Sequence, residues 1–327
     1  MSSNHNMPTE PIPVIDESPQ SEGISRRRFN VEILLGGLGF GALGAMATEE
    51  GMIIYDRYFS DDTPSGNTPE VRTEEAVTGL RDPAKKHLAR QITSTFEYST
   101  TEIPYDRAQN INDGRGITAG PDGFTSGTGD LLLVVHRYSV LRPNTPLSKY
   151  EPALKKITQS VAPGEMTDDV TGLNGFIETW GETSRTDPVL NQVQDVVSDE
   201  LYFDPAMKRC EDTGIKTAIG QEIIWDAIIQ HGEGEDKDGL PAMMKEVTDR
   251  IGVVNGNEVA WLHAFLDVRA EHLKNAAEEK TREGWLAAVS RVDALRSILD
   301  SGNLELDLSK GPISWTVYGD SFTLKQS

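Results

Sequence analysis

A glycine-rich stretch at residues 111–135 constrains this chain more than any other part of its sequence. Asp113 lies among three glycines near its beginning, and Asp130 lies near its end, at the start of an apolar run. Each glycine costs backbone entropy on folding, so folding alone is a weak reason for so many glycines beside charged groups. We interpret the stretch as a loop whose backbone a ligand approaches closely.

A third carboxylate, Glu97, lies sixteen residues upstream of Asp113, at the end of a helical pattern. Two carboxylates that flank a glycosidic bond are the usual equipment for hydrolysing a sugar polymer. Apolar neighbours, Phe96 and Tyr98, would raise the pKa of Glu97 and suit it to the acid. Asp113 suits the base, and Thr118 offers a hydroxyl to orient a water. Because the chain has 52 acidic residues, two solvated surface carboxylates remain the alternative.

Asp226 lies in the apolar run at residues 223–229, where a bare carboxylate would be costly to bury. It should therefore have a cationic partner. Arg269 and Arg291 lie in similar helical settings, and we predict an ion-pair network between these helices. The alternative places Asp226 on the exposed stripe of an amphipathic helix.

Asp130 and His231 each allow two interpretations. Asp130 either binds a ligand or lies at a helix N-terminus, where the helix dipole favours a carboxylate. His231 either faces a ligand or caps the helix that it ends. The five tryptophans could stack on sugar rings, but most are expected in the core. The single cysteine, Cys210, excludes an intramolecular disulfide and is predicted to be buried.

The formal net charge of -21 argues against nucleic-acid binding, because no basic face is available to neutralise phosphates. It suits a cationic ligand, or a solvent salty enough to screen charge repulsion; a merely soluble acidic protein is the alternative. No cluster of histidine, cysteine and carboxylate has metal-ligand spacing, so we expect neither a metal nor another cofactor. We expect a monomer.

The composition divides the chain into three parts. Residues 1–47 combine a disordered tail with Ser-Arg-Arg-Arg-Phe at residues 25–29 and a short apolar run, and they predict a twin-arginine-type export signal. Residues 48–78 form a polar linker, and residues 79–327 the folded domain. We expect a secreted, extracellular protein without stable membrane insertion after cleavage; an uncleaved anchor is the alternative.

The domain is predicted to be mainly helical, with a small strand component near residues 108–126. Asp82 should cap a helix that begins at Pro83 and runs to about residue 96. The segment 131–138 is a buried helix or strand, and residues 162–187 are loop-like. Further helices are expected at residues 149–161, 188–201, 205–231, 239–251, 257–279 and 284–301, and the last twenty-odd residues are extended.

The run Asn-Asp-Gly-Arg-Gly-Ile-Thr-Ala-Gly at residues 112–120, with Gly-Phe-Thr-Ser-Gly-Thr-Gly-Asp at 123–130, strongly resembles glycoside hydrolase family 46, the chitosanases. The likeness continues in consistent order to about residue 320. It passes through motifs at residues 149–154, 202–206, 220–221, 226–228, 231–232, 262–269, 290–293, 302–304 and 315–320.

The resemblance implies a two-lobed, lysozyme-like α+β fold at residues 79–327, with a small β-sheet in the minor lobe and a substrate cleft between the lobes. It implies endo-hydrolysis of the β-1,4 linkages of chitosan, a cationic glucosamine polymer, with inversion. Glu97 matches the family's general acid, Asp113 its general base and Thr118 the water-holding threonine. Substrate contacts are implied at Ser99, Arg115, Asp130, Tyr202, His231 and Gly232. Asp226, Arg269 and Arg291 match an ion-pair network behind the catalytic base.

Two departures from the family pattern affect the substrate subsites. Arg107 stands where an aromatic residue is expected, and extra residues lie around 276–285, where Glu278 or Glu279 could supply an acidic contact. Two alternatives to a chitosanase remain. One is a lysozyme-like hydrolase of another amino-sugar polymer, and the other is a non-catalytic polysaccharide-binding surface protein.

Overall fold

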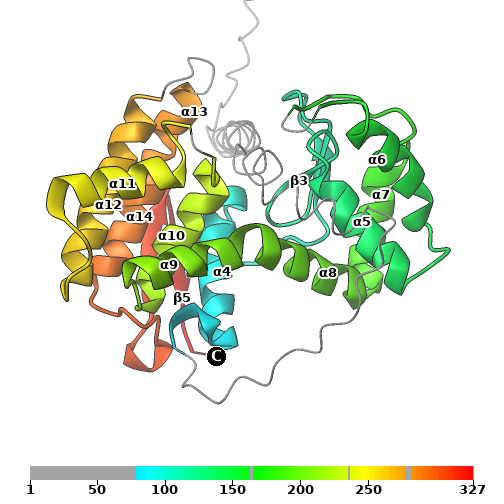
Figure 1. Cartoon of the computed structure of the whole chain (residues 1–327). Helices are drawn as coiled ribbons and strands as arrows, with labels where there is room; N and C mark the ends of the chain where they lie inside the picture. Colours follow the sequence, from blue (N-terminus) through cyan, green and yellow to red (C-terminus); the bar gives the residue numbers. More distant parts are fainter. Residues whose placement is uncertain (1–77, 163–164, 235, 277–281, 327) are drawn as a thin grey trace, which may run out of the picture.

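The computed structural model describes residues 78–162, 165–234, 236–276 and 282–326. These residues form two lobes, which Figure 1 shows on its right and left sides. The minor lobe holds a small sheet and the helices α5 to α7, and the major lobe holds most other helices and a C-terminal hairpin. The predicted fold class, mainly helical with a small sheet, is confirmed.

The minor lobe is built on a three-stranded antiparallel sheet in the order β1-β2-β3. The strands are β1 (Ala108–Asn110), β2 (Ile117–Ala119) and β3 (Phe124–Thr125). Two helices pack against the sheet, α5 (Asp130–Leu141) and α7 (Phe176–Thr186), and α6 (Glu151–Thr158) packs against α5. The segment 131–138, predicted as a buried helix or strand, is a helix. Its first five residues are buried because α5 packs against β3 on one side and against other helices on the other.

The prediction of a loop at residues 162–187 is wrong for α7. Gly175, in a left-handed conformation with φ 77°, forms the N-cap of the helix instead of interrupting it. Phe176, Trp180 and Thr183 recur at helical spacing and form the buried face of α7. That spacing was the available signal, and the nearby glycines obscured it.

A long helical run connects the lobes. It begins with α8 (Pro188–Ser198), passes through the π-helical turn η3 (Asp199–Phe203), and continues as α9 (Asp204–Thr213), as Figure 1 shows. The single helix predicted at residues 205–231 is two helices, because Gly214 at φ 82° ends α9 and a second helix, α10, begins at Ala218.

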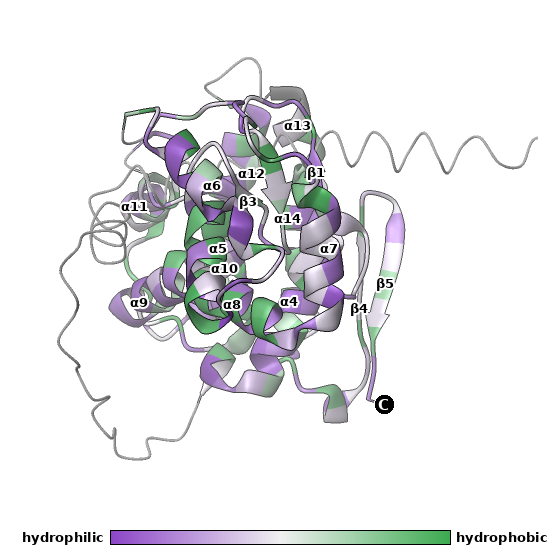
Figure 2. Cartoon of the chain, turned by 90° about the vertical axis from the view of Figure 1, so that its right-hand side faces the viewer, coloured by the Kyte–Doolittle hydropathy of each residue, from purple (hydrophilic) through white to green (hydrophobic). Residues whose placement is uncertain are grey.

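The major lobe surrounds α10 (Ala218–His231), whose side chains are all buried. Around it lie η1 (Gly79–Arg81), α4 (Pro83–Tyr98), α11 (Leu240–Ile251), α12 (Glu258–Lys274), α13 (Arg282–Ala287) and α14 (Val289–Asp300). Asp82 caps α4 as predicted, since its carboxylate accepts a hydrogen bond from the Ala84 amide at 2.8 Å. In Figure 2 the outer helices α9 and α11 carry many hydrophilic residues.

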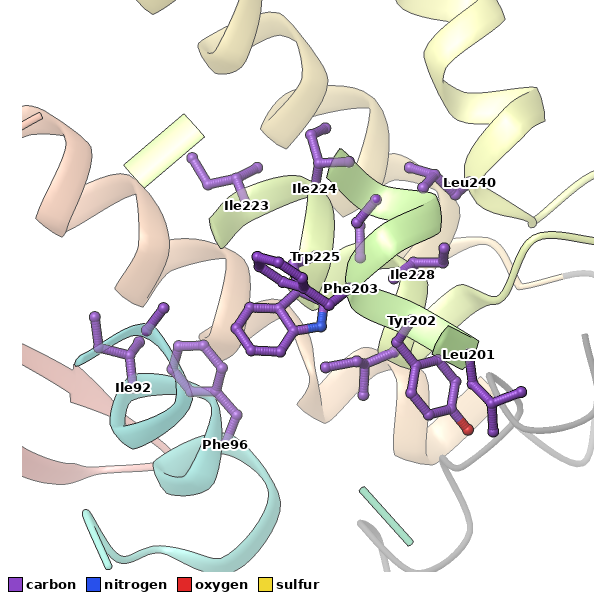
Figure 3. Close-up of a cluster of buried hydrophobic side chains, with 14 of the residues drawn as sticks. Ile92, Phe96, Leu201, Tyr202, Phe203, Ile223, Ile224, Trp225, Ile228 and Leu240 are labelled. Carbon is purple, nitrogen blue, oxygen red and sulfur yellow. The ribbon is translucent and has the colours of Figure 1, made fainter. Parts of the chain in front are cut away.

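The core of the major lobe joins segments that are far apart in the sequence. Figure 3 shows Phe96 of α4, Phe203 of η3 and Trp225 of α10 in one cluster; the Phe203 and Trp225 ring centroids lie 4.9 Å apart. All five tryptophans are buried, which confirms the expectation of core positions. Cys210 is buried and free, as predicted.

The C-terminal hairpin braces the first long helix. Strands β4 (Ile313–Val317) and β5 (Asp320–Leu324) pair antiparallel after the short helix η5 (Leu308–Lys310). The Trp315 indole donates a hydrogen bond to the Thr95 hydroxyl of α4 at 2.9 Å. The end of α4 is thus fixed from the C-terminal side of the chain.

The predicted export signal at residues 1–47 and almost all of the linker at 48–78 lie outside the described residues. Among the helices that the structure describes, none combines the length and apolar character needed to cross a membrane.

Candidate active site

Glu97 lies in the last turn of α4, where it meets a buried arginine. Its Oε1 is 2.5 Å from Nη1 of Arg291, and the guanidinium of Arg291 also lies over the Phe96 ring at 5.2 Å. Burial raises the pKa of the Glu97 carboxyl, and the Arg291 charge offsets part of that rise. A carboxyl in this setting keeps its proton to higher pH than an exposed glutamate does.

Arg291 is one part of a buried ion-pair network. Asp226 of α10 lies 2.6 Å from Nη2 of Arg291 and 2.7 Å from Nη1 of Arg269, and all three side chains are fully buried. Burial alone would raise the pKa of Asp226, but Arg291 and Arg269 together hold it below its usual value. The predicted network between these helices is therefore confirmed.

The network's position relative to the candidate acid and base was predicted wrongly. The expectation placed it behind Asp113, the candidate base. In the structure Arg291 joins Asp226 to Glu97, the candidate acid, through ion pairs on both carboxylates. The buried charges of α10, α12 and α14 therefore support the end of α4.

Asp113 lies on the connection between β1 and β2 and is held by a residue two positions further along. Arg115 donates to Asp113 Oδ2 from Nε at 2.8 Å, and the Arg115 amide donates to Oδ1 at 3.1 Å. Arg115 is only 5 % exposed. Its guanidinium thus orients Asp113, and the prediction of a substrate contact for Arg115 needs a ligand that reaches this buried group.

Two glycines of this loop, Gly116 and Gly127, are required by the protein's own packing. A Cβ on Gly116, at φ 75°, would overlap the Ser126 hydroxyl, and one on Gly127 would overlap the Thr167 carbonyl oxygen. The Thr167 amide also donates to the Gly127 carbonyl at 3.3 Å. The close approach at these two positions is therefore made by the protein's own chain, which holds the loop in place.

Thr118 lies in the middle of β2, opposite Gln109 and Thr125. Its Oγ1 is buried and has no hydrogen-bond partner among the described residues. Nearby, the Tyr98 hydroxyl donates to the Gly120 carbonyl at 2.8 Å and joins the end of α4 to the turn after β2. A hydrogen bond thus joins Tyr98, the residue after Glu97, to Gly120, two residues after Thr118.

Asp130 is the first residue of α5, as the helix-terminus interpretation expects. Its Oδ1 accepts hydrogen bonds from the Thr125 amide, the Thr128 hydroxyl and the Leu131 amide. Its Oδ2 is buried and has no partner among the described residues. Burial raises the pKa of Asp130 to about 6, against the lowering effect of these donors. The ligand role of Asp130 stays a prediction, and Oδ2 is the oxygen that could accept a hydrogen bond from a ligand.

The other predicted substrate contacts occupy different environments. Ser99 is half-buried at the C-terminal end of α4, with φ 53°. Tyr202 is 2 % exposed, and its pKa is raised by burial and then by the Asp130 carboxylate. His231 and Gly232 are buried at the end of α10. For His231 a direct substrate contact does not fit, since both ring nitrogens bind other groups of the protein.

Of the two departures from the family pattern, the structure describes Arg107 but not Glu278 and Glu279. The Arg107 guanidinium lies 4.8 Å above the Tyr98 ring, beside the candidate acid. Glu278 and Glu279 lie outside the described residues. Within the ranges that the structure covers, no group of three or more His, Cys, Asp or Glu side chains could hold a metal ion.

Sequence reasoning missed Arg90 and Asp122, which connect the lobes at this site. Arg90 of α4 donates to Asp122 at 3.3 Å and to the Ser198 hydroxyl at 3.0 Å. Asp122 belongs to the turn after β2, and Ser198 ends α8. The partners lie 32 and 108 residues from Arg90, so no local pattern could have paired them.

The chain is similar to known chitosanases. The profile of glycosyl hydrolase family 46 matches residues 91–311. A chitosanase of Bacillus subtilis (strain 168) is 42% identical over 232 residues, which cover 70% of this chain and 80% of the relative. A chitosanase of Streptomyces sp. (strain N174) is 37% identical over 256 residues, which cover 76% and 85%.

Solved structures agree. The complex of a Gynuella sunshinyii family 46 chitosanase with chitotetraose has a TM-score of 0.66 and 39% identity, and the match covers 78% of this chain and 100% of that one. The native chitosanase of Bacillus subtilis MY002 has a TM-score of 0.66 and 39% identity, with 75% and 99% covered.

Proposed function

Because the chain belongs to glycosyl hydrolase family 46, we propose that this glycoside hydrolase is an endo-acting chitosanase. It cleaves β-1,4 linkages between glucosamine units of chitosan with inversion at the anomeric carbon. The observation that carries the mechanism is the contrast between two carboxylates. Glu97 has a pKa raised by burial, whereas Asp113 is bound by the Arg115 guanidinium.

Glu97 is the general acid. It donates its proton to the glycosidic oxygen as the bond to the anomeric carbon breaks, so it must be protonated in the free enzyme. Burial favours the protonated form, and Arg291 limits that effect and fixes the position of Oε1. After the step, Arg291 stabilises the carboxylate that has formed.

Asp113 is the general base. It takes a proton from a water molecule as the water oxygen attacks the anomeric carbon from the face opposite the leaving group. Arg115 orients the Asp113 carboxylate through its guanidinium and amide. The Thr118 hydroxyl, which has no hydrogen-bond partner in the part of the chain that the structure describes, is available to hold the same water. Inversion calls for a carboxyl separation of about 6.5–9.5 Å in the complex with substrate.

The charge of the protein suits a cationic polymer. The formal net charge is -21, and an acidic enzyme attracts a polymer of protonated amines and increases its encounter rate. A solved relative is a complex with chitotetraose, an oligomer of the same chemistry. Chitin and peptidoglycan carry neutral N-acetyl groups, which gain nothing from this charge.

The test compares reducing-end release from fully deacetylated chitosan by residues 48–327 and by the Glu97→Gln and Asp113→Asn variants. We expect rapid chain shortening by the parent and losses of about 10²- to 10⁴-fold in each variant, since each removes one proton-transfer group. Fully acetylated polymer is the control substrate. Faster cleavage of that polymer would indicate another amino-sugar hydrolase, and binding of chitosan without any cleavage would indicate a non-catalytic binding protein.

We also propose that the enzyme is exported and acts outside the cell. The support is the Ser-Arg-Arg-Arg-Phe motif and the short apolar run before Ala47. In cells, replacement of Arg26 and Arg27 by lysine should abolish the appearance of activity in the medium. Activity in the medium at the parental level would rule out the twin-arginine route.

A further inference from the structure

His231, the last residue of α10, is 5 % exposed. Its Nδ1 lies 3.0 Å from the Asp238 carbonyl oxygen, and its Nε2 lies 3.3 Å from Nε of Arg269. A carbonyl oxygen can only accept, and a guanidinium can only donate. The hydrogen of the neutral ring must therefore be on Nδ1, and Nε2 must present its lone pair to Arg269.

The surroundings of His231 keep the ring neutral. Burial lowers its pKa well below the usual value, and the positive charges of Arg269, Arg291 and His272 lower it further; the Asp238 carbonyl opposes them. The His231 ring also packs against Trp285 in a T-shaped arrangement, with ring centroids 5.1 Å apart at 76°. A second proton on Nε2 would point directly at the Arg269 N–H.

Arg269 depends on this neutral ring for one of its three contacts. Its Nη1 pairs with Asp226 at 2.7 Å, its Nη2 donates to the Gln230 side-chain oxygen, and its Nε donates to His231. A planar guanidinium held at all three nitrogens has one orientation. Arg269 in that orientation contacts Oδ2 of Asp226 and leaves Oδ1 for Arg291. Arg291 in turn pairs with Glu97.

We propose that His231 is a positioning residue for Glu97, which it influences through Arg269, Asp226 and Arg291. The proposal rests on the proposed role of Glu97 as the general acid. It replaces the substrate contact implied by the family resemblance. Asp238 extends the arrangement toward the surface, because its carboxylate lies 2.7 Å from the His272 ring while its carbonyl binds His231.

Two matched substitutions separate the contacts of the ring. Glutamine at position 231 is long enough for its amide oxygen to accept from Arg269, whereas asparagine places its amide nitrogen near the position of Nδ1 and cannot reach Arg269. We expect His231→Gln to keep kcat for chitosan within about threefold, and His231→Asn to lose about tenfold or more in kcat with little change in KM.

The pH profile gives a second readout. In His231→Asn, Arg291 is held less firmly and lowers the pKa of Glu97 less. The proton of Glu97 is then retained to higher pH, so the basic limb of the kcat profile should move upward, and it should stay in place in His231→Gln. Thermal unfolding of both variants checks that the kcat difference does not come from loss of folded protein.

A double-mutant cycle tests the route through Arg269. Lysine lacks the Nε donor, so His231→Asn should cost little more kcat in an Arg269→Lys background than that background costs alone. The ring ¹⁵N shifts of His231 in the parent should report a neutral Nδ1–H tautomer between about pH 5 and pH 8.

Three outcomes would overturn the proposal: equal kcat losses in His231→Gln and His231→Asn, a rise in KM with kcat unchanged, or full additivity with Arg269→Lys. Any of them in a chitosan-cleaving parent would leave the proposed function intact. Failure of the parent itself to cleave chitosan would instead remove the proposed function.

Discussion

Asp226 of the major lobe and Asp130 of the minor lobe are both almost completely buried, at 0 % and 1 % exposed, yet they are stabilised in opposite ways. Asp226 meets two arginines, which hold its pKa below the usual value against the effect of burial. Asp130 meets two amides and a hydroxyl, and its pKa rises to about 6. Countercharge keeps one carboxyl ionised, whereas neutral donors leave the other poised near neutrality.

The difference matches what each carboxyl holds in place. The charged network of α10, α12 and α14 holds the Arg291 guanidinium against Glu97, whose protonation state changes in the proposed mechanism. The loop around Asp130 has to keep a fixed shape beside β3, which neutral hydrogen bonds and a helix N-terminus accomplish. Three substitutions, ordered by the size of their expected effect, test this contrast.

Asp226→Asn should be the most damaging to stability. It leaves Arg269 and Arg291 buried without their shared carboxylate, and we expect the free energy of unfolding to fall by about 3–5 kcal/mol. Because the folded pKa of Asp226 is lowered, its stabilisation is present above the unfolded pKa and is lost as pH falls through the folded pKa. Denaturant unfolding should therefore show a larger deficit at about pH 7 than at about pH 3.

The control for this substitution is Asp212→Asn, which breaks the exposed pair of Lys208 and Asp212 on α9. That change should have no measurable effect on unfolding. A deficit for Asp226→Asn that is equally small, or independent of pH, would contradict a charge-stabilised network.

Asp130→Asn should change how stability depends on pH. Asp130 has a folded pKa of about 6 against an ordinary value of 3.8. Its contribution to the stability of the parent is therefore fully present below the unfolded pKa and is lost as pH rises through the folded pKa. Asparagine removes this loss, on the order of 3 kcal/mol. Melting temperatures at about pH 4 and pH 7 should favour the variant, relative to the parent, at the higher pH.

The same variant addresses the ligand role of Asp130. A rise in KM for chitosan at unchanged kcat would assign Oδ2 the ammonium contact that the family resemblance implies. A difference in melting temperature that does not change with pH would show that Asp130 is ionised in the folded protein throughout, against the contrast drawn with Asp226.

Thr128→Val should have the smallest of the three effects. It removes the hydroxyl that donates to Asp130 Oδ1 at 2.8 Å and keeps the shape of the side chain. We expect a cost of about 1–2 kcal/mol at neutral pH, where the acceptor is charged, and less at pH 4, where it is protonated. Ser139→Ala, which removes a hydroxyl bonded to a neutral carbonyl in α5, should show no such pH dependence.

The sequence predicted the buried charges well because their reason is local. A carboxylate within the apolar run of α10 needs a cation wherever the helix lies, and Arg269 of α12 and Arg291 of α14 lie in similar helical settings. The same local reasoning could not predict that the network contacts Glu97. Arg291 lies 194 residues from Glu97, and only the tertiary fold brings the end of α4 to α14.

His231 shows the same limit at a single residue. A histidine at a helix end next to glycine is typical of a cap or an exposed contact, and the sequence offered no way to tell that even the end of α10 is buried. The glycines of the catalytic loop were likewise interpreted as a response to a ligand. Their actual neighbour at Gly127 is Thr167, which is 40 positions away and belongs to no recognisable motif.

The attachment of α4 to the C-terminal part of the chain has a consequence for biosynthesis. The partners that seat this helix, Arg291 for Glu97 and Trp315 for Thr95, follow it by 194 and 220 residues. At ordinary translation rates the ribosome needs roughly 10 to 40 seconds to make the intervening chain. Glu97, the proposed acid, is thus translated early and reaches its final position late. Under the proposed mechanism, a nascent or prematurely terminated chain that already contains both carboxylates is expected to be inactive.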